Sequence, residues 1–138
     1  MKTKIYIFIL LYISLTSCKI NHKVSGLKEG KWISYDTLNN EIYKYVEKYK
    51  KGIEVKTWKT FKNKKLYKKE VYLKDKCDVT YYNENRRIVV RGQTKSEITE
   101  KEIHWFYYGD WKHYDENGKL TMIKNYINGE LISEKEIK

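Results

Sequence analysis

One stretch constrains the fold more than any other: residues 109–130, which read GDWKHYDENGKLTMIKNYINGE. Asn117-Gly118 and Asn128-Gly129 are residue pairs that readily adopt the positive φ angles of tight hairpin turns. The segment 120–126 between them has the length of a typical β-strand. The stretch therefore predicts a strand, a tight turn, a second strand and another tight turn.

Weaker copies of this pattern occur three times upstream. Each has an aromatic or apolar first strand, a turn and a second strand, with turns expected at 36–40, 62–65 and 83–86. The segment 83–88 aligns with 115–120 without a gap. The equivalent first-strand positions, Trp32, Trp58, Val79 and Trp111, are unevenly spaced. Uneven spacing favours hairpins with turns of different lengths over a rigid solenoid.

The composition also favours strands. The chain of 138 residues contains no alanine and no proline, and it contains 14 tyrosines. Alanine is the best helix former, whereas aromatic and β-branched residues suit a pleated surface. The length allows one domain rather than two. We therefore expect an all-β fold, an elongated antiparallel sheet of repeated β-hairpins that covers residues 27–138.

Three segments need separate predictions. The segment 42–49 fits a strand in the repeat register, although its apolar residues also fall at helical spacing. The charged segment 93–102 is expected to form a hydrated loop or a single helical turn. The aromatic segment 103–108 should be a strand that leads into the fourth hairpin. The tail, 131–138, is expected to be a last edge strand or frayed.

The N-terminus is predicted to be a targeting segment. Lys2 and Lys4 precede an apolar run at 5–13, which is far shorter than the roughly 20 residues that span a membrane. Leu15-Thr16-Ser17-Cys18 follows the run and resembles the lipobox of bacterial lipoproteins. The resemblance implies cleavage before Cys18 and acylation of its thiol, and several acyl chains anchor a protein stably. The alternative is an ordinary secretory signal with a chance cysteine.

This resemblance divides the chain into a signal peptide (1–17), a lipidated cysteine with a tether (18–26) and the repeat domain (27–138). It places the protein at the cell envelope, facing the periplasm or the cell surface. Lys19 stands where an aspartate often marks retention in the inner membrane. In a cell with two membranes, the outer membrane is therefore favoured.

The hairpin units resemble MORN-type repeats, and more closely their bacterial variant, with G-x-W-x-x-Y, a turn ending in N-G, and Y-x-N-G. The similarity is clearest at 109–129 and 30–52 and is degraded at 56–92. It implies a MORN-like meander used for binding. Some proteins of the variant family are labelled antitoxin components of toxin–antitoxin systems. An antitoxin normally meets its toxin in the cytoplasm, so for an exported chain the label implies only an immunity-type role outside it.

The chain is strongly basic, with a formal net charge of +11 and a sequence pI of about 9.4. Removal of residues 1–17 leaves 27 Lys and Arg against 18 Asp and Glu, so the basic character belongs to the exported domain. Such a charge favours anionic partners such as lipid headgroups or acidic glycans. Nucleic acid is an unlikely partner outside the cytoplasm.

The sequence predicts neither an enzyme nor a cofactor or metal site. The candidate acids, bases and nucleophiles have no spacing known from a catalytic arrangement, and Asp110 and His113 should point to opposite faces of a strand. Apart from Cys18, Cys77 and three scattered histidines cannot assemble a zinc site. Cys77 is expected to be a buried strand residue, with a reactive thiol as the alternative.

Binding is the favoured class of function. The candidate binding residues are Trp105, Tyr107, Trp111, Lys112 and Tyr114, where the strand 103–108 meets the fourth hairpin. Rings interleaved with cations can stack on sugars or bases and contact anionic groups, although half the rings could instead form the core. We expect a membrane-anchored lipoprotein that binds an unidentified protein partner. The alternative is an envelope-structural protein that docks on anionic lipid or glycan.

Overall fold

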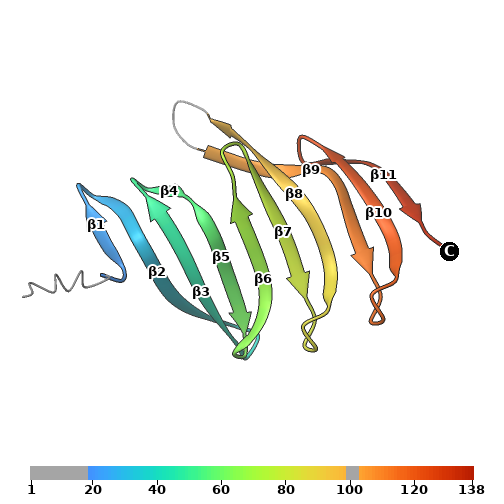
Figure 1. Cartoon of the computed structure of the whole chain (residues 1–138), viewed down its shortest axis with the longest axis horizontal. Coiled ribbons are helices and arrows are strands. Elements are labelled where there is room, and N and C mark those ends of the chain that lie inside the picture. The colour runs from blue at the N-terminus through green and yellow to red at the C-terminus, as the bar shows by residue number, and fades with distance from the viewer. Residues whose placement is uncertain (1–18, 99–102) are drawn as a thin grey trace, which may run out of the picture.

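The computed structural model describes residues 19–98 and 103–138, and these residues form one open antiparallel sheet. The strands are β1 (His22–Val24), β2 (Leu27–Leu38), β3 (Glu41–Lys50), β4 (Ile53–Glu54), β5 (Lys56–Lys62), β6 (Lys65–Tyr72), β7 (Lys76–Tyr82), β8 (Ile88–Ile98), β9 (Ile103–Tyr114), β10 (Leu120–Ile127) and β11 (Glu130–Glu136). Apart from β4, which pairs only with β3, the strands follow one another across the sheet in chain order. Figure 1 shows this meander, with β1 and β11 at opposite ends. The expected all-β sheet of hairpins is confirmed.

Two predictions at the N-terminus need comment. The predicted signal peptide at 1–17 and the predicted acylation site, Cys18, lie outside the described residues. The tether at 18–26 is wrong in part, because His22–Val24 pairs with β2 and forms the first strand of the sheet. The Asn21 side chain holds this entry segment: its Oδ1 accepts from the Ile33 backbone N–H, and its Nδ2 donates to the Ile33 carbonyl at 2.8 Å. The described residues contain no helix that is long and apolar enough to cross a membrane.

Tight turns connect most of the hairpins. Five of them place two consecutive residues at positive φ, which matches the twist of the flanking strands. These pairs are Ser25-Gly26, Asn39-Asn40, Lys51-Gly52, Asn63-Lys64 and Asn128-Gly129. The turns at 39–40 and 63–64 are shorter than the expected turns at 36–40 and 62–65. The difference arises because strand pairing continues to Leu38↔Glu41 and Lys62↔Lys65.

Two longer turns share one construction. The Asn83 Oδ1 accepts from the backbone N–H groups of Asn85 and Arg87, and the Asp115 Oδ1 accepts from those of Asn117 and Lys119 in the same way. This side-chain bonding is an Asx turn. The gapless alignment of 83–88 with 115–120 therefore corresponds to two turns with the same hydrogen bonds.

The structure settles the remaining segment predictions. Residues 42–49 belong to β3, so the strand prediction is confirmed and the helical alternative is wrong. The loop predicted at 93–102 is wrong for 93–98, because β8 continues to Ile98 and pairs with β9; residues 99–102 are not described. The segment 103–108 begins β9, as expected, and most of the tail forms the edge strand β11.

The sheet has two unlike faces, which the pairing register assigns, since direct cross-strand partners point to the same side. The aromatic face carries Trp32, Tyr49, Trp58, Tyr72, Cys77, Trp105 and Trp111. The basic face carries Lys31, Lys48, Lys59, Lys69, Arg91 and Lys112. Every buried side chain of the described residues lies on the aromatic face: Tyr49, Thr60, Cys77, Val79 and Trp111. The small core of this thin sheet is centred on Cys77, Val79 and Trp111.

Candidate binding surfaces

The structure divides the predicted binding residues between the two faces of β9. Tyr107 and Trp111 lie on the aromatic face, where their rings stack with centroids 4.2 Å apart, and Trp105 lies there too. Lys112 pairs with Arg91 on the basic face, and Arg91 lies over the ring of Tyr114 with its Cζ 5.6 Å from the centroid. The sequence therefore located a region correctly as a strand, but its five residues do not form one site.

Trp111 belongs to the core rather than to an exposed site. Its side chain is 3% exposed, and its Nε1 donates to the Gln93 carbonyl at 3.0 Å. Its indole lies directly against Gly92 on β8, where a Cβ would be only 2.3 Å from the Trp111 Cδ2. The ring is therefore held by packing and by its own hydrogen bond, and a partner on the surface could not reach most of it.

A groove lined by tyrosines crosses the aromatic face. We call it the aromatic groove and define it by Tyr43, Tyr45, Tyr67, Tyr81 and Tyr107. It consists of two depressions of about 410 and 390 Å³ that share Tyr67 and Tyr81. The Tyr43–Tyr67 and Tyr67–Tyr81 ring centroids are 6.1 and 5.6 Å apart, both edge to face. Edge-to-face packing restrains the rings, so the groove exists before any partner arrives.

Charged side chains of both signs lie among the tyrosines of the groove: Lys59, Lys68, Glu47 and Glu70. Burial raises the pKa of Tyr81, although the nearby Lys68 ammonium opposes this effect. Burial also lowers the pKa of Lys68, but the hydrogen bond and charge of Glu70 outweigh it and the net pKa is raised. Lys68 and Glu70 form an ion pair of 2.8 Å beside the rings. The groove thus offers tyrosine hydroxyl groups, the Lys68–Glu70 ion pair and the charges of Glu47 and Lys59 around an aromatic floor.

Only one groove tyrosine, Tyr107, was among the predicted site residues. The signal that could have found the others is the period of two along each hairpin, which places Tyr43 and Tyr45 on one face of β3. The period of two does not predict the face of Tyr67, because the β5–β6 register shifts between Thr60 and Phe61 and leaves Tyr67 without a direct partner. A bulge of this kind is not visible in a single sequence, so the groove needed the pairing register to be recognised.

The basic face brings like charges directly opposite one another. Four cross-strand pairs consist of two cations: Lys31 with Lys48, Lys59 with Lys69, Lys76 with Lys95, and Arg91 with Lys112. Like charges at directly opposed positions destabilise a sheet. The ion pairs that the described residues form involve other lysines, namely Lys28, Lys62, Lys65, Lys68 and Lys124. The cations of these four pairs therefore have no salt-bridge partner within the described part of the chain.

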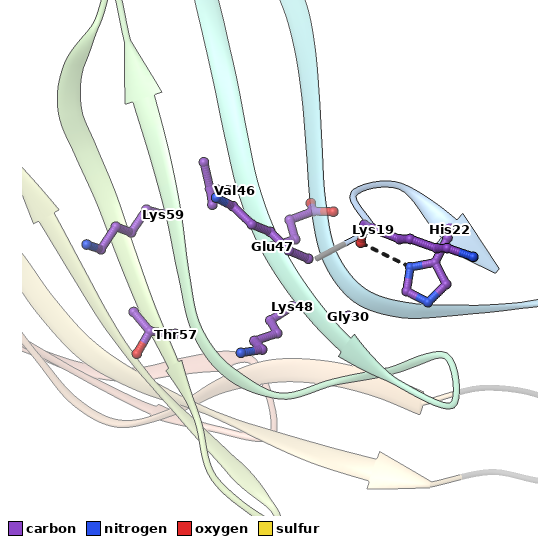
Figure 2. Close-up of a pocket in the computed structure, with 9 residues that line it drawn as sticks. Lys19, His22, Gly30, Val46, Glu47, Lys48, Thr57 and Lys59 are labelled. Carbon is purple, nitrogen blue, oxygen red and sulfur yellow. Dashed lines mark hydrogen bonds between the residues drawn. The ribbon is translucent and has the colours of Figure 1, made fainter. Parts of the chain in front are cut away.

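A hollow opens at the N-terminal end of the basic face. Its volume is about 580 Å³, and its lining includes four lysines, Lys19, Lys31, Lys48 and Lys59, together with His22 and one acid, Glu47. Figure 2 shows Lys48 and Lys59 on neighbouring strands and Lys19 opposite them, with the His22 Nδ1 bonded to the Lys19 carbonyl at 3.1 Å. We call this hollow the basic pocket. It lies where the chain enters the sheet, directly after the proposed lipidated residue.

The titratable groups on the sheet are dispersed. Asp110 accepts from the Asn125 Nδ2 at 2.8 Å on the basic face, whereas His113 lies opposite Met122 on the aromatic face. Cys77 is 1% exposed, and burial raises the pKa of its thiol to about 12, so the thiolate that reacts with electrophiles is scarce at neutral pH. Among residues 19–98 and 103–138, no group of three His, Cys, Asp or Glu side chains is placed to hold a metal ion.

None of the protein-family models matches this chain, and no curated protein or solved structure matches it either. The lipobox and MORN-type resemblances therefore rest on the motifs themselves and stay predictions.

Proposed function

We propose that this protein is an exported, lipid-anchored module of the cell envelope that binds a protein partner through the aromatic groove. The observation that carries the proposal is the groove itself: a concave, preformed surface lined by tyrosines, on a sheet with one face much more aromatic than the other. Tyrosine is enriched at protein interfaces because it supplies a large contact area and a hydroxyl group with few rotatable bonds.

The exposed fractions support a role in contact rather than in packing alone. Tyr67 and Tyr107 are 36% and 41% exposed, so a partner can reach both side chains, while neighbouring rings hold them in place. Anchors that are rigid before binding lose little conformational entropy when a partner docks. A partner segment with apolar side chains and hydrogen-bond acceptors for the tyrosine hydroxyl groups fits this groove.

Two variants test the groove. Crosslinking and capture from intact cells should recover one stoichiometric protein with the wild-type chain, and the complex should survive high salt. Tyr67→Ser should lose that protein. Tyr35→Ser is the matched control, because Tyr35 is 65% exposed and lies on the opposite face, beside Lys44. Equal recovery with both variants would exclude the groove as the contact surface.

The anchor has its own test. Cys18→Ser should abolish labelling by a fatty-acid probe and move the protein out of the membrane fraction, since the thiol is the proposed acylation site. Unchanged fractionation of this variant would refute lipidation. The pull-down does not depend on that result, because the groove is distant from Cys18 in the sequence.

A second candidate function is docking on an anionic component of the envelope. The opposed cation pairs on the basic face favour it, because an anionic surface would offset a repulsion that the sheet otherwise sustains. Binding of this kind should collapse between low and high ionic strength. An immunity-type role is the protein-partner proposal with a toxin as the partner, and it predicts a toxin that is neutralised only when this chain is present.

A further inference from the structure

One line of cross-strand partners runs over the basic face from β2 to β11. Each member is the direct partner of the next: Ile33, Val46, Lys59, Lys69, Thr80, Arg91, Lys112, Ile123 and Lys135. We call its five cations, Lys59, Lys69, Arg91, Lys112 and Lys135, the basic row. It runs perpendicular to the strands and therefore along the length of the sheet in Figure 1.

Successive cations of the basic row lie one or two strands apart, because Thr80 on β7 and Ile123 on β10 stand between them. Neighbouring strands are about 4.8 Å apart, so the seven strands from β5 to β11 extend the row over about 30 Å. At its N-terminal end Lys59 also lines the basic pocket, where Lys31, Lys48 and Lys19 continue the positive charge. From β7 to β11, the register places four acids on this face: Asp78 accepts from the Gln93 amide at 2.7 Å, Asp110 accepts from Asn125, Glu97 lies opposite His104, and Glu130 lies opposite Ile127.

Aromatic rings flank the row on the same face. Arg91 lies over the ring of Tyr114, and Lys95 lies over the ring of Tyr108 at 5.2 Å. Tyr108 is exposed to solvent. A cation next to a solvent-exposed aromatic ring provides the two elements that contact a sugar carrying an acidic group, because the ring packs on the sugar face and the cation pairs with the acid.

We propose that the basic row, together with the basic pocket, binds a linear acidic glycan of the cell envelope along the length of the sheet. The glycan lies across the strands, its acidic groups pair with successive cations of the row, and sugar faces pack on Tyr108 and Tyr114. The inference rests on the exported location in the proposed function. It specifies the second candidate function, docking on an anionic envelope component, by naming the ligand as an acidic glycan and its course as across the strands.

The geometry favours a glycan over two other polyanions. A lipid surface is fluid and is attracted by cations wherever they are exposed, so it does not require a straight row at directly opposed positions. A nucleic-acid strand would use rings for base stacking, but an exported protein meets glycans rather than nucleic acid. Both alternatives make different predictions in the same titration.

Fluorescence anisotropy of labelled polygalacturonate, a linear glycan with one carboxylate per sugar, tests the proposal with the whole chain in detergent. We expect saturable binding that weakens as salt rises, and no binding of neutral dextran. The triple variant Lys69→Gln, Arg91→Gln and Lys112→Gln should bind more than about tenfold more weakly. Its folding is checked by circular dichroism, and Lys69→Gln alone provides a milder variant with a smaller loss in the same direction.

A matched control separates the row from net charge. Lys23→Gln, Lys74→Gln and Lys119→Gln together remove the same three charges from exposed positions outside the row, and binding should change by less than about twofold. An equal loss of polygalacturonate binding in both triple variants would show that net charge, and not the basic row, determines the binding. Tighter binding to phosphatidylglycerol vesicles or to single-stranded oligothymidylate than to polygalacturonate overturns the glycan as its ligand.

The outcome can be separated from that of the proposed function. Absence of polygalacturonate binding, with the protein partner still captured through Tyr67, overturns the glycan site alone. Absence of acyl labelling in the wild-type chain would overturn the lipid anchor alone. The anisotropy titration would be unaffected, since the row lies wholly within the described sheet.

Discussion

The tightest steric relationship at the scale of single residues is that between Gly92 and Trp111. A methyl group at position 92 would overlap the indole, which is already fixed by its hydrogen bond to Gln93. Gly92→Ala should therefore displace Trp111 from the core and lower the free energy of unfolding by about 1–3 kcal/mol, the usual cost of overpacking. Urea unfolding measures this loss. Thr94→Ala, two residues along the same face of β8, is the control and should cost clearly less.

His113 predicts a specific pH dependence of stability. Burial, followed by the positive charge of Lys124, lowers the pKa of His113 below its ordinary value of 6.5. The folded state thus binds this proton less readily than the unfolded state does. The stability that neutral His113 contributes is complete above about pH 6.5 and is lost as the pH falls through the lowered folded-state pKa.

The variant that checks this is His113→Gln. Its melting temperature should fall less than that of wild type between about pH 7.5 and 5, because the titrating group is gone. His104→Gln is the control, since His104 is exposed on the same strand and on the other face. A fall identical to wild type in His113→Gln would show that other groups cause the pH dependence.

The residue scale also shows why the binding residues were predicted only in part. An aromatic run in a strand predicts that rings will alternate between the faces, and Trp111 and Tyr114 do so. Whether a ring is buried or exposed depends on the residues of the partner strand that face it. Trp111 is buried because Gly92 leaves room for it, and Gly92 lies 19 positions earlier in the sequence. No local pattern contains that pairing.

At the scale of elements, the two Asx turns predict a stabilising substitution. Gly118 has φ +84 in the β9–β10 turn, and Arg86 occupies the equivalent place in the β7–β8 turn with φ 61. A side chain in the left-handed region is strained, whereas glycine adopts it freely. Arg86→Gly should raise the free energy of unfolding by roughly 0.5–1 kcal/mol, after allowance for the greater flexibility of the unfolded chain.

A glycine at the neighbouring position, 85, is the control and should have the opposite effect on stability. Asn85→Gly introduces the same flexibility without relieving a positive φ, so it should destabilise the protein in the same thermal unfolding assay. If Arg86→Gly were also destabilising, the left-handed strain at this turn would not be the dominant effect.

Elements were predictable where turn chemistry marks them. Asn-Gly at 117–118 and at 128–129 predicted the positions of the last two turns correctly, because the residues that make these turns are local. Both residues of the second pair have positive φ, whereas in the first pair only Gly118 does and the Asp115 side chain holds the turn. The polar and charged side chains of residues 93–98 favour a loop. These residues form a strand since β9 offers a long partner, which pairs Lys95 with Phe106 and Glu97 with His104. Pairing across a distant strand overrides local polarity.

For the whole molecule, the open sheet presents two separate surfaces, one to each of the proposed ligands. Rings and paired charges collect on one side, and cations without salt-bridge partners in the described chain collect on the other. A partner in the aromatic groove and a polyanion on the basic row would therefore occupy opposite sides and need not compete. The chain could hold a protein on one face while the other rests on the envelope matrix.

The same asymmetry predicts how salt changes the stability of the whole protein. The four opposed cation pairs of the basic face destabilise the sheet, whereas exposed ion pairs contribute little. Raising the ionic strength from about 10 to 100 mM shortens the Debye length from about 30 to 10 Å and screens the repulsion. The melting temperature should therefore rise with sodium chloride, and rise less in the triple variant Lys69→Gln, Arg91→Gln and Lys112→Gln. A melting temperature that falls with salt would mean that the ion pairs of the aromatic face, such as Lys68 with Glu70, outweigh the repulsion on the basic face.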